Sequence, residues 1–396
     1  MIYVGIDVAK ETHYAAVMDD NSNVLVKPFD FTNDAVGFAK LISKLTSFQK
    51  DNLLIGLEST GIYSEDLIAF LYDSGFSIAV INPIQTATLR KTGIRKTKTD
   101  KTDTFLIIKS LMVNPYHLYT RQAAVTMKLK SSCRYRQNLK KSKARLKTQL
   151  SAYVNMVFPE LTTFFKSGIH IAACYELLKM CPSPAGIAAL RIDKLSKLLS
   201  KASHGHFGRS SAEALKSLAK TSVGVKNPYI SIQITQTIAS IELLEQQIEE
   251  IETLIEETMK ELDSVIMTIP GIGAMDGAMI LGEIGDISRF ASASKLLAYA
   301  GLDPTVCQSG NFRARSTRMS KRGSKTLRFA LINAAWQLTL HSDVFKAYYD
   351  LKRSAGLGHY AALGHVAHKL VRVLFKLLRS QVPFDENFLL TSQIGG

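Results

Sequence analysis

Short apolar runs and amphipathic segments alternate through the first 115 residues. Five runs rich in β-branched and aromatic residues lie at 2–6, 13–18, 24–31, 53–57 and 77–81. Polar turns separate the first three, which is typical of antiparallel strands. Apolar residues with helical spacing occupy 36–45, after the capping stretch Thr32-Asn33-Asp34, and 61–74. The pattern predicts an α/β domain over residues 1–115.

Residues 116–262 have a different pattern, which predicts two long helices. The first is basic: 128–147 carries nine Lys or Arg above an apolar stripe, and no acid occurs from 104 to 159. The second repeats apolar residues at alternating spacings of three and four from Ile241 to Leu262, a heptad seam, and carries eight Glu. Charge pairing favours one antiparallel coiled coil within the chain. The alternative is a dimerisation coiled coil with its basic face on nucleic acid, and we expect both together.

The segment 160–230, between these helices, is the least informative part of the chain. It contains helix-like stretches at 172–180, 192–199 and 211–219. His204 and His206 lie close together, but no acid lies nearby, which favours a polar loop over a metal site. No functional site is predicted here.

The last region, 263–396, is predicted to be helical. Pro270-Gly271-Ile272-Gly273 precedes a helix at 274–284 and resembles a helix-hairpin-helix turn. In such a turn the backbone N–H groups at Gly271 and Gly273 can hold a phosphate, although a simple tight turn remains the alternative. Further helices are expected at 292–300, 325–340 and 364–380, with Trp336 in the core.

Composition then narrows the class of partner. The chain has 49 Lys and Arg against 34 Asp and Glu, a net charge of +15. Such a charge favours nucleic acid first and an anionic membrane surface second. No apolar run reaches the length of a membrane span, so no membrane partner is expected. The N-terminus is typical of a strand rather than a signal peptide, and the four cysteines lack zinc-like spacing, which predicts a cytoplasmic protein.

Four carboxylates occupy positions suited to metal-dependent chemistry. Asp7 follows the first strand, Glu58 follows the fourth, and Asp100 and Asp103 lie three apart at the start of a helical run. Three antiparallel strands followed by strands that alternate with helices are the strand order of an RNase H-like sheet. Oxygen ligands gathered in this way suit Mg²⁺, with Mn²⁺ as a possible substitute. Each acid alone has an ordinary structural explanation; the set of four is the informative feature.

A hydroxyl lies in a second candidate region. Ser309-Gly310 precedes a basic run with seven Lys or Arg from 313 to 328, and no acid occurs between Asp303 and Asp343. A serine among cations can attack a phosphodiester, although for this stretch taken alone a solvated Ser-Gly turn is the favoured explanation. The predicted phosphate ligands here are Arg313, Arg315, Arg318, Lys321 and Arg322. On the basic helix they are Lys128, Lys130, Arg134, Arg136, Lys140, Lys141 and Lys143.

In combination these motifs resemble a known family. They are Gly5-Ile6-Asp7-Val8-Ala9-Lys10, Glu58-Ser59-Thr60-Gly61, Ile81-Asn82-Pro83, Lys98-Thr99-Asp100-Lys101-Thr102-Asp103, Ile269-Pro270-Gly271-Ile272-Gly273, Ala300-Gly301-Leu302-Asp303-Pro304, Gln308-Ser309-Gly310 and Met319-Ser320-Lys321-Arg322-Gly323. The chain resembles insertion-sequence transposases that have an N-terminal DEDD, RuvC-like domain and a C-terminal domain with a catalytic serine. The resemblance spans nearly the whole chain except 160–230.

The resemblance implies a mechanism and partners. Asp7, Glu58, Asp100 and Asp103 would bind Mg²⁺, and Ser309 would form a covalent link to DNA. A non-coding bridge RNA would guide the enzyme. The active site would be composite between protomers, in a homo-oligomer that grows from dimer to tetramer.

Three alternatives differ from this expectation. A RuvC-like nuclease would use water instead of serine. The Gly-Ile-Asp opening also begins sugar kinases and actin-like ATPases, but their further glycine-rich phosphate motifs are absent. A non-catalytic nucleic-acid-binding protein would not need the four acids and the serine.

Overall fold

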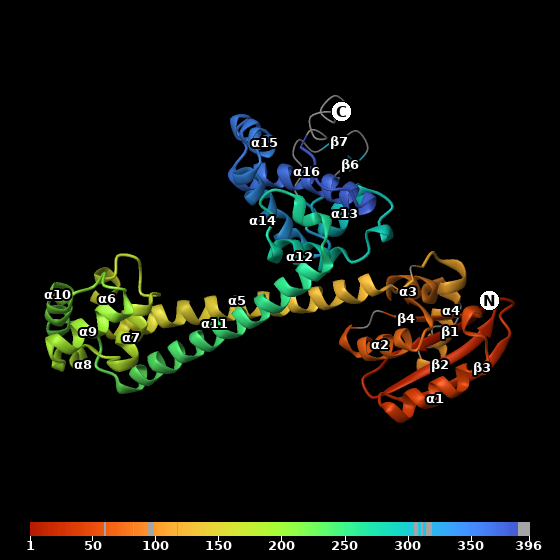
Figure 1. Cartoon of the computed structure of the whole chain (residues 1–396), viewed down its shortest axis with the longest axis horizontal. Helices are drawn as coiled ribbons and strands as arrows, with labels where there is room; N and C mark the ends of the chain where they lie inside the picture. The colour runs from red at the N-terminus through yellow and green to blue at the C-terminus, as the bar shows by residue number, and fades with distance from the viewer. Residues whose placement is uncertain are drawn as a thin grey trace. The chain divides into compact units, whose positions relative to one another are not determined.

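The computed structural model describes residues 1–58, 61–81, 83–92, 99–116, 118–304, 308–309, 312–313 and 319–386. For 61, 62, 84, 91, 92, 308, 309, 312 and 313 the description is limited to the backbone. The chain forms two compact units (Figure 1): residues 1–127 with 285–291, and 128–284 with 292–396. The first unit extends to Met127, which lies beyond the domain boundary expected at residue 115. Compact units are not the same as domains, and the expected boundary stays a prediction.

The first unit contains a five-stranded sheet. Its strands are β1 (Ile2–Asp7), β2 (Thr12–Asp19), β3 (Val24–Thr32), β4 (Leu53–Glu58) and β5 (Ser77–Ile81). Their order is β3-β2-β1-β4-β5, with β1, β2 and β3 antiparallel and β1, β4 and β5 parallel. This topology confirms the predicted α/β, RNase H-like class.

Helices cover both faces of this sheet. On one face, α1 (Ala35–Leu45) and α2 (Glu65–Asp73) share a core with β1 and β4. On the other face, α4 (Asp100–Val113) packs through Ile107, Ile108 and Leu111. The Asp34 carboxylate caps α1 by accepting from the Gly37 N–H at 2.8 Å, as the capping stretch predicts. The helix expected at 61–74 is a 3₁₀ turn, η2 (Gly61–Ser64), followed by α2, and α3 (Pro83–Thr92) was not predicted.

The second unit contains the long antiparallel helix pair. Helix α5 (Arg121–Val157) supplies its residues from 128 onward, and α11 (Pro228–Leu262) is its partner. Arg136 and Lys140 pair with Glu252, whereas Lys143 and Lys147 pair with Glu245, so the two helices run in opposite directions. The seam residues Ile241, Ile248 and Ile255 are buried. The predicted coiled coil within the chain is therefore confirmed.

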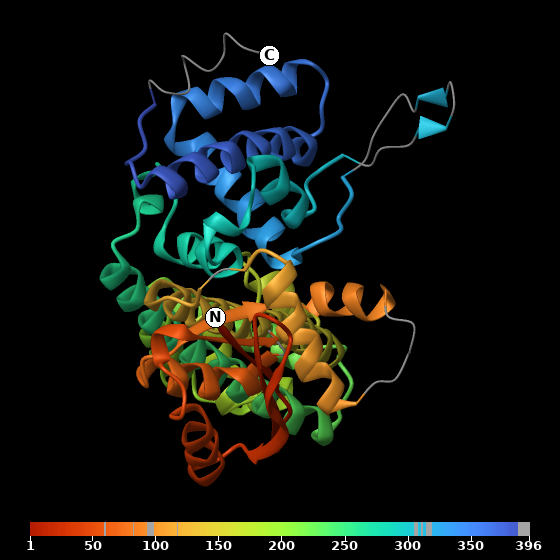
Figure 2. The same cartoon turned by 90° about the vertical axis from the view of Figure 1, so that its right-hand side faces the viewer.

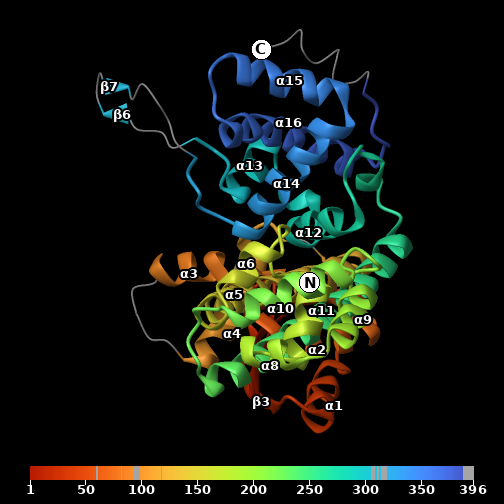
Figure 3. The same ribbon diagram turned by 90° about the vertical axis from the view of Figure 1, so that its left-hand side faces the viewer.

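A cluster of short helices connects α5 to α11, and we call residues 160–227 the helical insert. Its helices are α6 (Glu160–Phe164), α7 (Ala172–Met180), α8 (Pro184–Ala189), α9 (Ile192–Ala202) and α10 (Arg209–Lys220). They enclose a common core with the adjoining ends of α5 and α11, which includes Phe165, Leu177 and Leu215. Figure 3 shows the insert around these helix ends.

The remaining helices of the second unit follow α11. They are η3 (Val265–Thr268), α12 (Ala274–Ile284), α13 (Ala293–Ala300), α14 (Lys325–His341), α15 (Asp343–Ser354) and α16 (His359–Ser380), while η4 (Ile287–Arg289) belongs to the first unit. Helix α15 was not predicted, and α16 begins five residues before the expected Gly364. The prediction that Trp336 lies in the core is wrong: it is 39% exposed and contacts the His359 ring edge-on at 5.1 Å. Among the described residues, no helix is long and apolar enough to cross a membrane.

Candidate active site and nucleic-acid-binding residues

Two of the predicted acids end adjacent parallel strands. Asp7 is the last residue of β1 and Glu58 is the last residue of β4. The register pairs Ile6 with Leu57, so both acids leave the sheet at the same edge. Chemistry in open α/β sheets is commonly placed at this carboxyl edge.

Helix α4 carries the other two predicted acids in its first turn. Thr99 caps the helix by a reciprocal capping box with Thr102, which fixes where the first turn begins. Within that turn Asp100 is exposed, whereas Asp103 is buried. Of the two acids expected to share a face, Asp103 is thus the one shielded from solvent.

Two glycines allow α4 to lie close to the sheet. Gly5 of β1 pairs with Gly56 of β4. A Cβ atom at Gly5 would lie 2.2 Å from the backbone oxygen of Thr104, and one at Gly56 would lie 2.6 Å from Leu111 Cδ1. Only glycine permits this approach at residue 5, since the opposing atom is backbone. The close packing positions the first turn of α4, and with it Asp103.

Helix α3 supplies polar partners to two of the acids. The Thr86 hydroxyl donates to Glu58 Oε1, and Arg90 Nη2 lies 2.8 Å from Asp103 Oδ1. The ion pair lacks hydrogen-bond alignment: within the described part of the chain, Asp103 Oδ1 and Arg90 Nε are buried with no hydrogen-bond partner. Thr86 and Arg90 were not predicted, because α3 has no clear apolar period. Pro83 at its start was the available signal, since proline favours the first helical position.

The donor set suits a divalent cation. It consists of carboxylates, which are hard oxygen ligands, and Asp103 Oδ1 is a buried acceptor that a cation could satisfy. At present Arg90 provides the positive charge beside Asp103. Among the described residues, no three His, Cys, Asp or Glu side chains gather closely enough to hold a metal ion. The predicted set of four therefore stays a prediction.

His13 is a buried neighbour of the loop after Asp7 that sequence analysis missed. Its Nδ1 accepts from the Ala9 N–H at 3.2 Å, and its ring packs against Phe31 at 5.0 Å. Burial lowers the pKa of His13, because it disfavours the charged imidazolium. The His13 ring thus holds the Ala9 N–H at the start of this loop.

Ser309 lies in a two-stranded ribbon of the second unit, formed by β6 (Gln308–Ser309) and β7 (Phe312–Arg313). Ser309 pairs with Phe312, and Gln308 pairs with Arg313. Figure 2 shows β6 and β7 set apart from helices α13–α16. The side chains of Ser309 and Arg313 lie outside the described part, as do Arg315 and Arg318 entirely.

The chain is tightly bonded where it leaves and rejoins the helical part. The Ser320 N–H donates to the Asp303 carbonyl at 2.8 Å, and its hydroxyl donates to the Asp303 carboxylate at 2.5 Å. The Lys321 N–H donates to the Gly301 carbonyl at 3.0 Å. Lys321 has a positive φ of 54°, and Arg322 is exposed. These bonds close the base of the segment that carries Ser309.

The predicted phosphate ligands on α5 divide into two groups. Arg134, Arg136, Lys140 and Lys143 form ion pairs with Glu283, Glu252 or Glu245. Lys128 and Lys141 are exposed and Lys130 is partly buried, and none has an ion pair among the described residues. Lys130 contributes to the lowered pKa of Glu283, so Lys128 and Lys141 are the residues of this group whose charge is available to a polyanion.

The two glycines of the predicted phosphate-binding turn differ in how closely other atoms approach them. Gly271 has a φ of +76°, and a Cβ there would lie 2.8 Å from the His341 ring and 3.0 Å from the Gln337 carbonyl oxygen. Gly273 faces open space. Gly271 thus packs against α14, while Gly273 stays accessible.

Comparison with known proteins matches two parts of the chain to transposases. Residues 4–159 match the DEDD transposase model of the IS110 type, and 263–350 match the model described as transposase IS116/IS110/IS902 family. A mini-circle putative transposase for IS117 from Streptomyces coelicolor is 24% identical over 97% of this chain and 95% of its own length. A pilin gene-inverting protein from Moraxella bovis is 25% identical over 97% of this chain and 98% of its own. Neither family model covers the helical insert.

Proposed function

The chain belongs to the IS116/IS110/IS902 family of transposases, which act on DNA, and from this premise we propose that it exchanges DNA strands through a covalent Ser309–DNA intermediate. The observation that carries the proposal is the arrangement of acids in the first unit. Asp7 and Glu58 end neighbouring parallel strands at one edge of the sheet, and Gly5 lets the first turn of α4, which carries Asp103, lie close to β1.

The serine step balances without an added energy source. Ser309 Oγ bonds to the DNA phosphorus, the bond from phosphorus to the 3′ oxygen breaks, and the serine proton ends on that oxygen. A 3′ hydroxyl of another strand then attacks the phosphoserine, the bond from phosphorus to Ser309 Oγ breaks, and the proton of that hydroxyl ends on Oγ, which restores a phosphodiester. Each step exchanges one phosphate ester for another, so ATP is not required.

This chain's residues have distinct proposed roles. Arg313, Arg315, Arg318 and Lys321 neutralise the charge that develops on the phosphate oxygens, while Arg322 and Gly273 hold backbone phosphates. Asp7, Glu58, Asp100 and Asp103 would hold Mg²⁺ or Mn²⁺, which would polarise the scissile phosphate.

We also propose a guide RNA and a second protomer. The available cations on α5 offer contacts to nucleic-acid phosphates, which suit an enzyme whose target sequence is read by base pairing with a bridge RNA. In the proposed oligomer one copy supplies the acids, which belong to the first unit, and another copy supplies Ser309, which belongs to the second.

The decisive experiment incubates the chain with its element's terminal DNA, the flanking non-coding RNA and Mg²⁺. Denaturing gels are expected to show a protein–DNA adduct that is absent in Ser309→Ala and in Asp7→Ala. Ser354→Ala, an exposed serine of α15, is the matched control and should form the adduct. Mixing the two inactive variants should restore it if protomers share the site.

A water-using nuclease predicts a different result. Ser309→Ala would then cut DNA at the normal rate and no variant would form an adduct. That outcome would refute the serine intermediate while leaving the role of the acids intact.

A further inference from the structure

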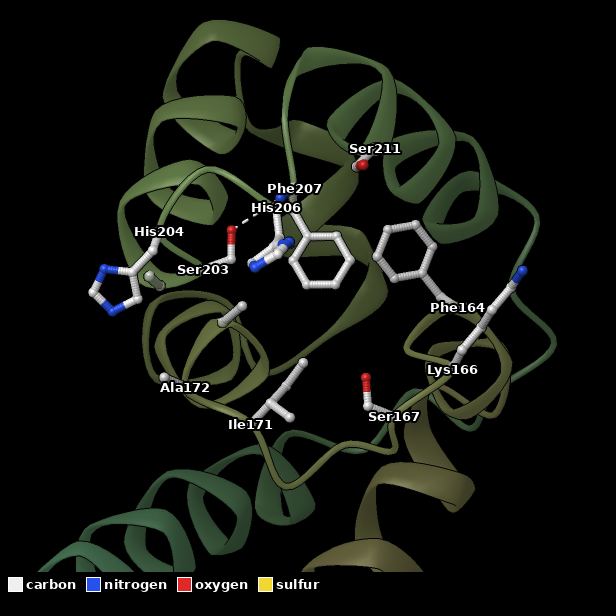
Figure 4. Close-up of a pocket in the computed structure, with 12 residues that line it drawn as sticks. Phe164, Lys166, Ser167, Ile171, Ala172, Ser203, His204, His206, Phe207 and Ser211 are labelled. Carbon is white, nitrogen blue, oxygen red and sulfur yellow. Dashed lines mark hydrogen bonds between the residues drawn. The ribbon is translucent and has the colours of Figure 1, made fainter.

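The helical insert contains a pocket of about 620 Å³ that no motif predicted (Figure 4). It lies between α6, the start of α7, the loop from α9 to α10 and the start of α10. Its lining residues are Phe164, Lys166, Ser167, Ile171, Ala172, Ala173, Ala202, Ser203, His204, His206, Phe207 and Ser211. The volume is within the range that small ligands occupy, and no acidic side chain lines it.

Two aromatic rings form one side of this pocket. Figure 4 shows Phe164 and Phe207 next to each other, with Ser167 and Ile171 across from them. The ring centroids lie 6.2 Å apart and the planes are inclined by 30°. Both rings remain partly accessible, so their apolar faces are available to a flat ligand.

Phe207 is held in place from two directions. Its N–H donates to the Ser203 hydroxyl oxygen at 2.9 Å, and its ring meets the fully buried Phe165 edge-on at 5.2 Å. The loop between Ser203 and Phe207 turns at His204 and Gly205, which have φ angles of 51° and 90°. The Gly205 N–H closes that turn on the Ser200 carbonyl at 2.8 Å. The aromatic surface is therefore preorganised, which lowers the entropy cost of binding.

Exposed lysines without ion-pair partners among the described residues lie along α9, the helix that ends at the pocket. The insert has ten Lys or Arg and four Asp or Glu, a net charge of +6. Lys194, Lys197 and Lys201 are exposed, share one helical face at spacings of three and four, and have no ion pair within the described part. Lys201 directly precedes the pocket residue Ala202, and Lys166 lines the pocket itself.

We propose that this pocket binds an unstacked nucleobase of a single-stranded nucleic acid, with Lys166 and the α9 lysines on the neighbouring phosphates. Aromatic platforms beside a cationic track are how proteins hold single strands, because every base has a face that can stack. The inference rests on the proposed function only in that nucleic acid is the partner. The single strand can come from RNA or from DNA, which share this chemistry.

The test measures binding of the full chain to a fluorescein-labelled, unpaired 12-nucleotide RNA and to DNA of the same sequence. Phe207→Leu keeps apolar volume but removes the ring, and should weaken binding about five- to tenfold without changing its salt dependence. Replacing Lys194, Lys197 and Lys201 with Ala should lower the slope of log affinity against log salt by about 2, since each phosphate contact contributes about 0.7. Whichever strand shows these effects identifies the source.

Controls separate the pocket from general effects. Tyr360→Leu and Lys260→Ala alter exposed residues outside the insert and should bind as wild type. A duplex should be insensitive to Phe207→Leu, because its bases stay stacked. In a 5-iodouridine oligonucleotide, the photocrosslink should map to Phe164, His206 or Phe207.

Two results would overturn the proposal. One is single-strand binding by Phe207→Leu within twofold of wild type in a chain with unchanged melting temperature. The other is a Phe207→Leu chain that binds the oligonucleotides as wild type does but no longer binds an oligoglutamate peptide. That result would make the pocket a peptide site. Neither result bears on Ser309, because the adduct assay does not measure single-strand affinity; failure of the adduct with intact binding would refute only the strand-exchange mechanism.

Discussion

Replacing Glu283 with Gln tests whether Arg134 serves the fold or nucleic acid. Glu283 of α12 has a side chain 1% exposed and accepts from Arg134 Nε at 2.6 Å and Nη2 at 3.0 Å. It also accepts from the Ser324 hydroxyl at 2.7 Å, and Ser324 caps α14. One buried carboxylate thus joins α5, α12 and the start of α14.

The expected cost follows from these contacts. Breaking a buried ion pair costs about 3–5 kcal/mol when the remaining charge stays buried. The Arg134 side chain is 51% exposed, so it regains water, and Gln retains one acceptor oxygen. We therefore expect the free energy of unfolding to fall by about 2–3 kcal/mol.

The same contacts give a direction for pH dependence. Burial by itself would raise the pKa of Glu283, but hydrogen bonds from Arg134 and Ser324 outweigh it and lower that pKa from 4.5. A carboxylate with a lowered folded-state pKa stabilises fully above its unfolded pKa. Its contribution is lost as the pH falls below about 4.5 through the folded value. Glu283→Gln should remove this dependence.

The assay is urea unfolding followed by tryptophan fluorescence. The single tryptophan, Trp336, lies on α14 in the same unit as Glu283 and reports its unfolding. Asp350→Asn is the control because Asp350 pairs with Lys346 at 3.3 Å with both side chains exposed, and it should cost about 0.5 kcal/mol or less. A change below 0.5 kcal/mol in Glu283→Gln, or an equal change in both variants, would refute the reasoning.

Three further outcomes are expected. Gly5→Ala should destabilise the first unit by about 1–3 kcal/mol in circular-dichroism melts and slow DNA cleavage, because its Cβ would clash with the Thr104 backbone. Gly56→Ala should lower the stability less, because its Cβ would meet a leucine methyl group that can move. Arg90→Gln should tighten Mn²⁺ binding several-fold in calorimetry by removing the cation beside Asp103, and Asp103→Asn should abolish that gain. Lys141→Gln should lower the salt slope of duplex binding by about 0.9 without changing the melting temperature, and an unchanged slope would exclude it as a phosphate contact.

The sheet could be predicted because its signal is local. The runs that end at Asp7 and Glu58 are apolar on both faces, and short turns fix the pairing of the first three strands. Helix α3 could not be predicted in this way, because its sequence lacks an apolar stripe. Arg90 and Thr86 were missed with it, although they are the described partners of two candidate acids.

The pairing of charges was the harder problem. The basic helix and the acidic helix were both predicted. Which acid pairs with a given Lys or Arg depends on how each helix is rotated about its own axis, and sequence spacing does not determine that rotation. Arg134 lies 149 positions from Glu283, and neither residue has a local feature that links them. The Trp336 prediction failed because the rotation of α14 is also not given by sequence spacing. Trp336 lies at the protein surface, where its ring contacts those of His359 and Tyr349.

The length of α11 sets a minimum size for any nucleic acid that contacts both of its ends. Its 35 uninterrupted residues give a length of about 52 Å, with the helical insert before its first turn and α12 after its last. That length equals about 15 base pairs of B-form DNA. A nucleic acid bound at both ends of α11 must therefore extend over at least this distance, and removing two heptads from both α5 and α11 would shorten the required span by about 21 Å.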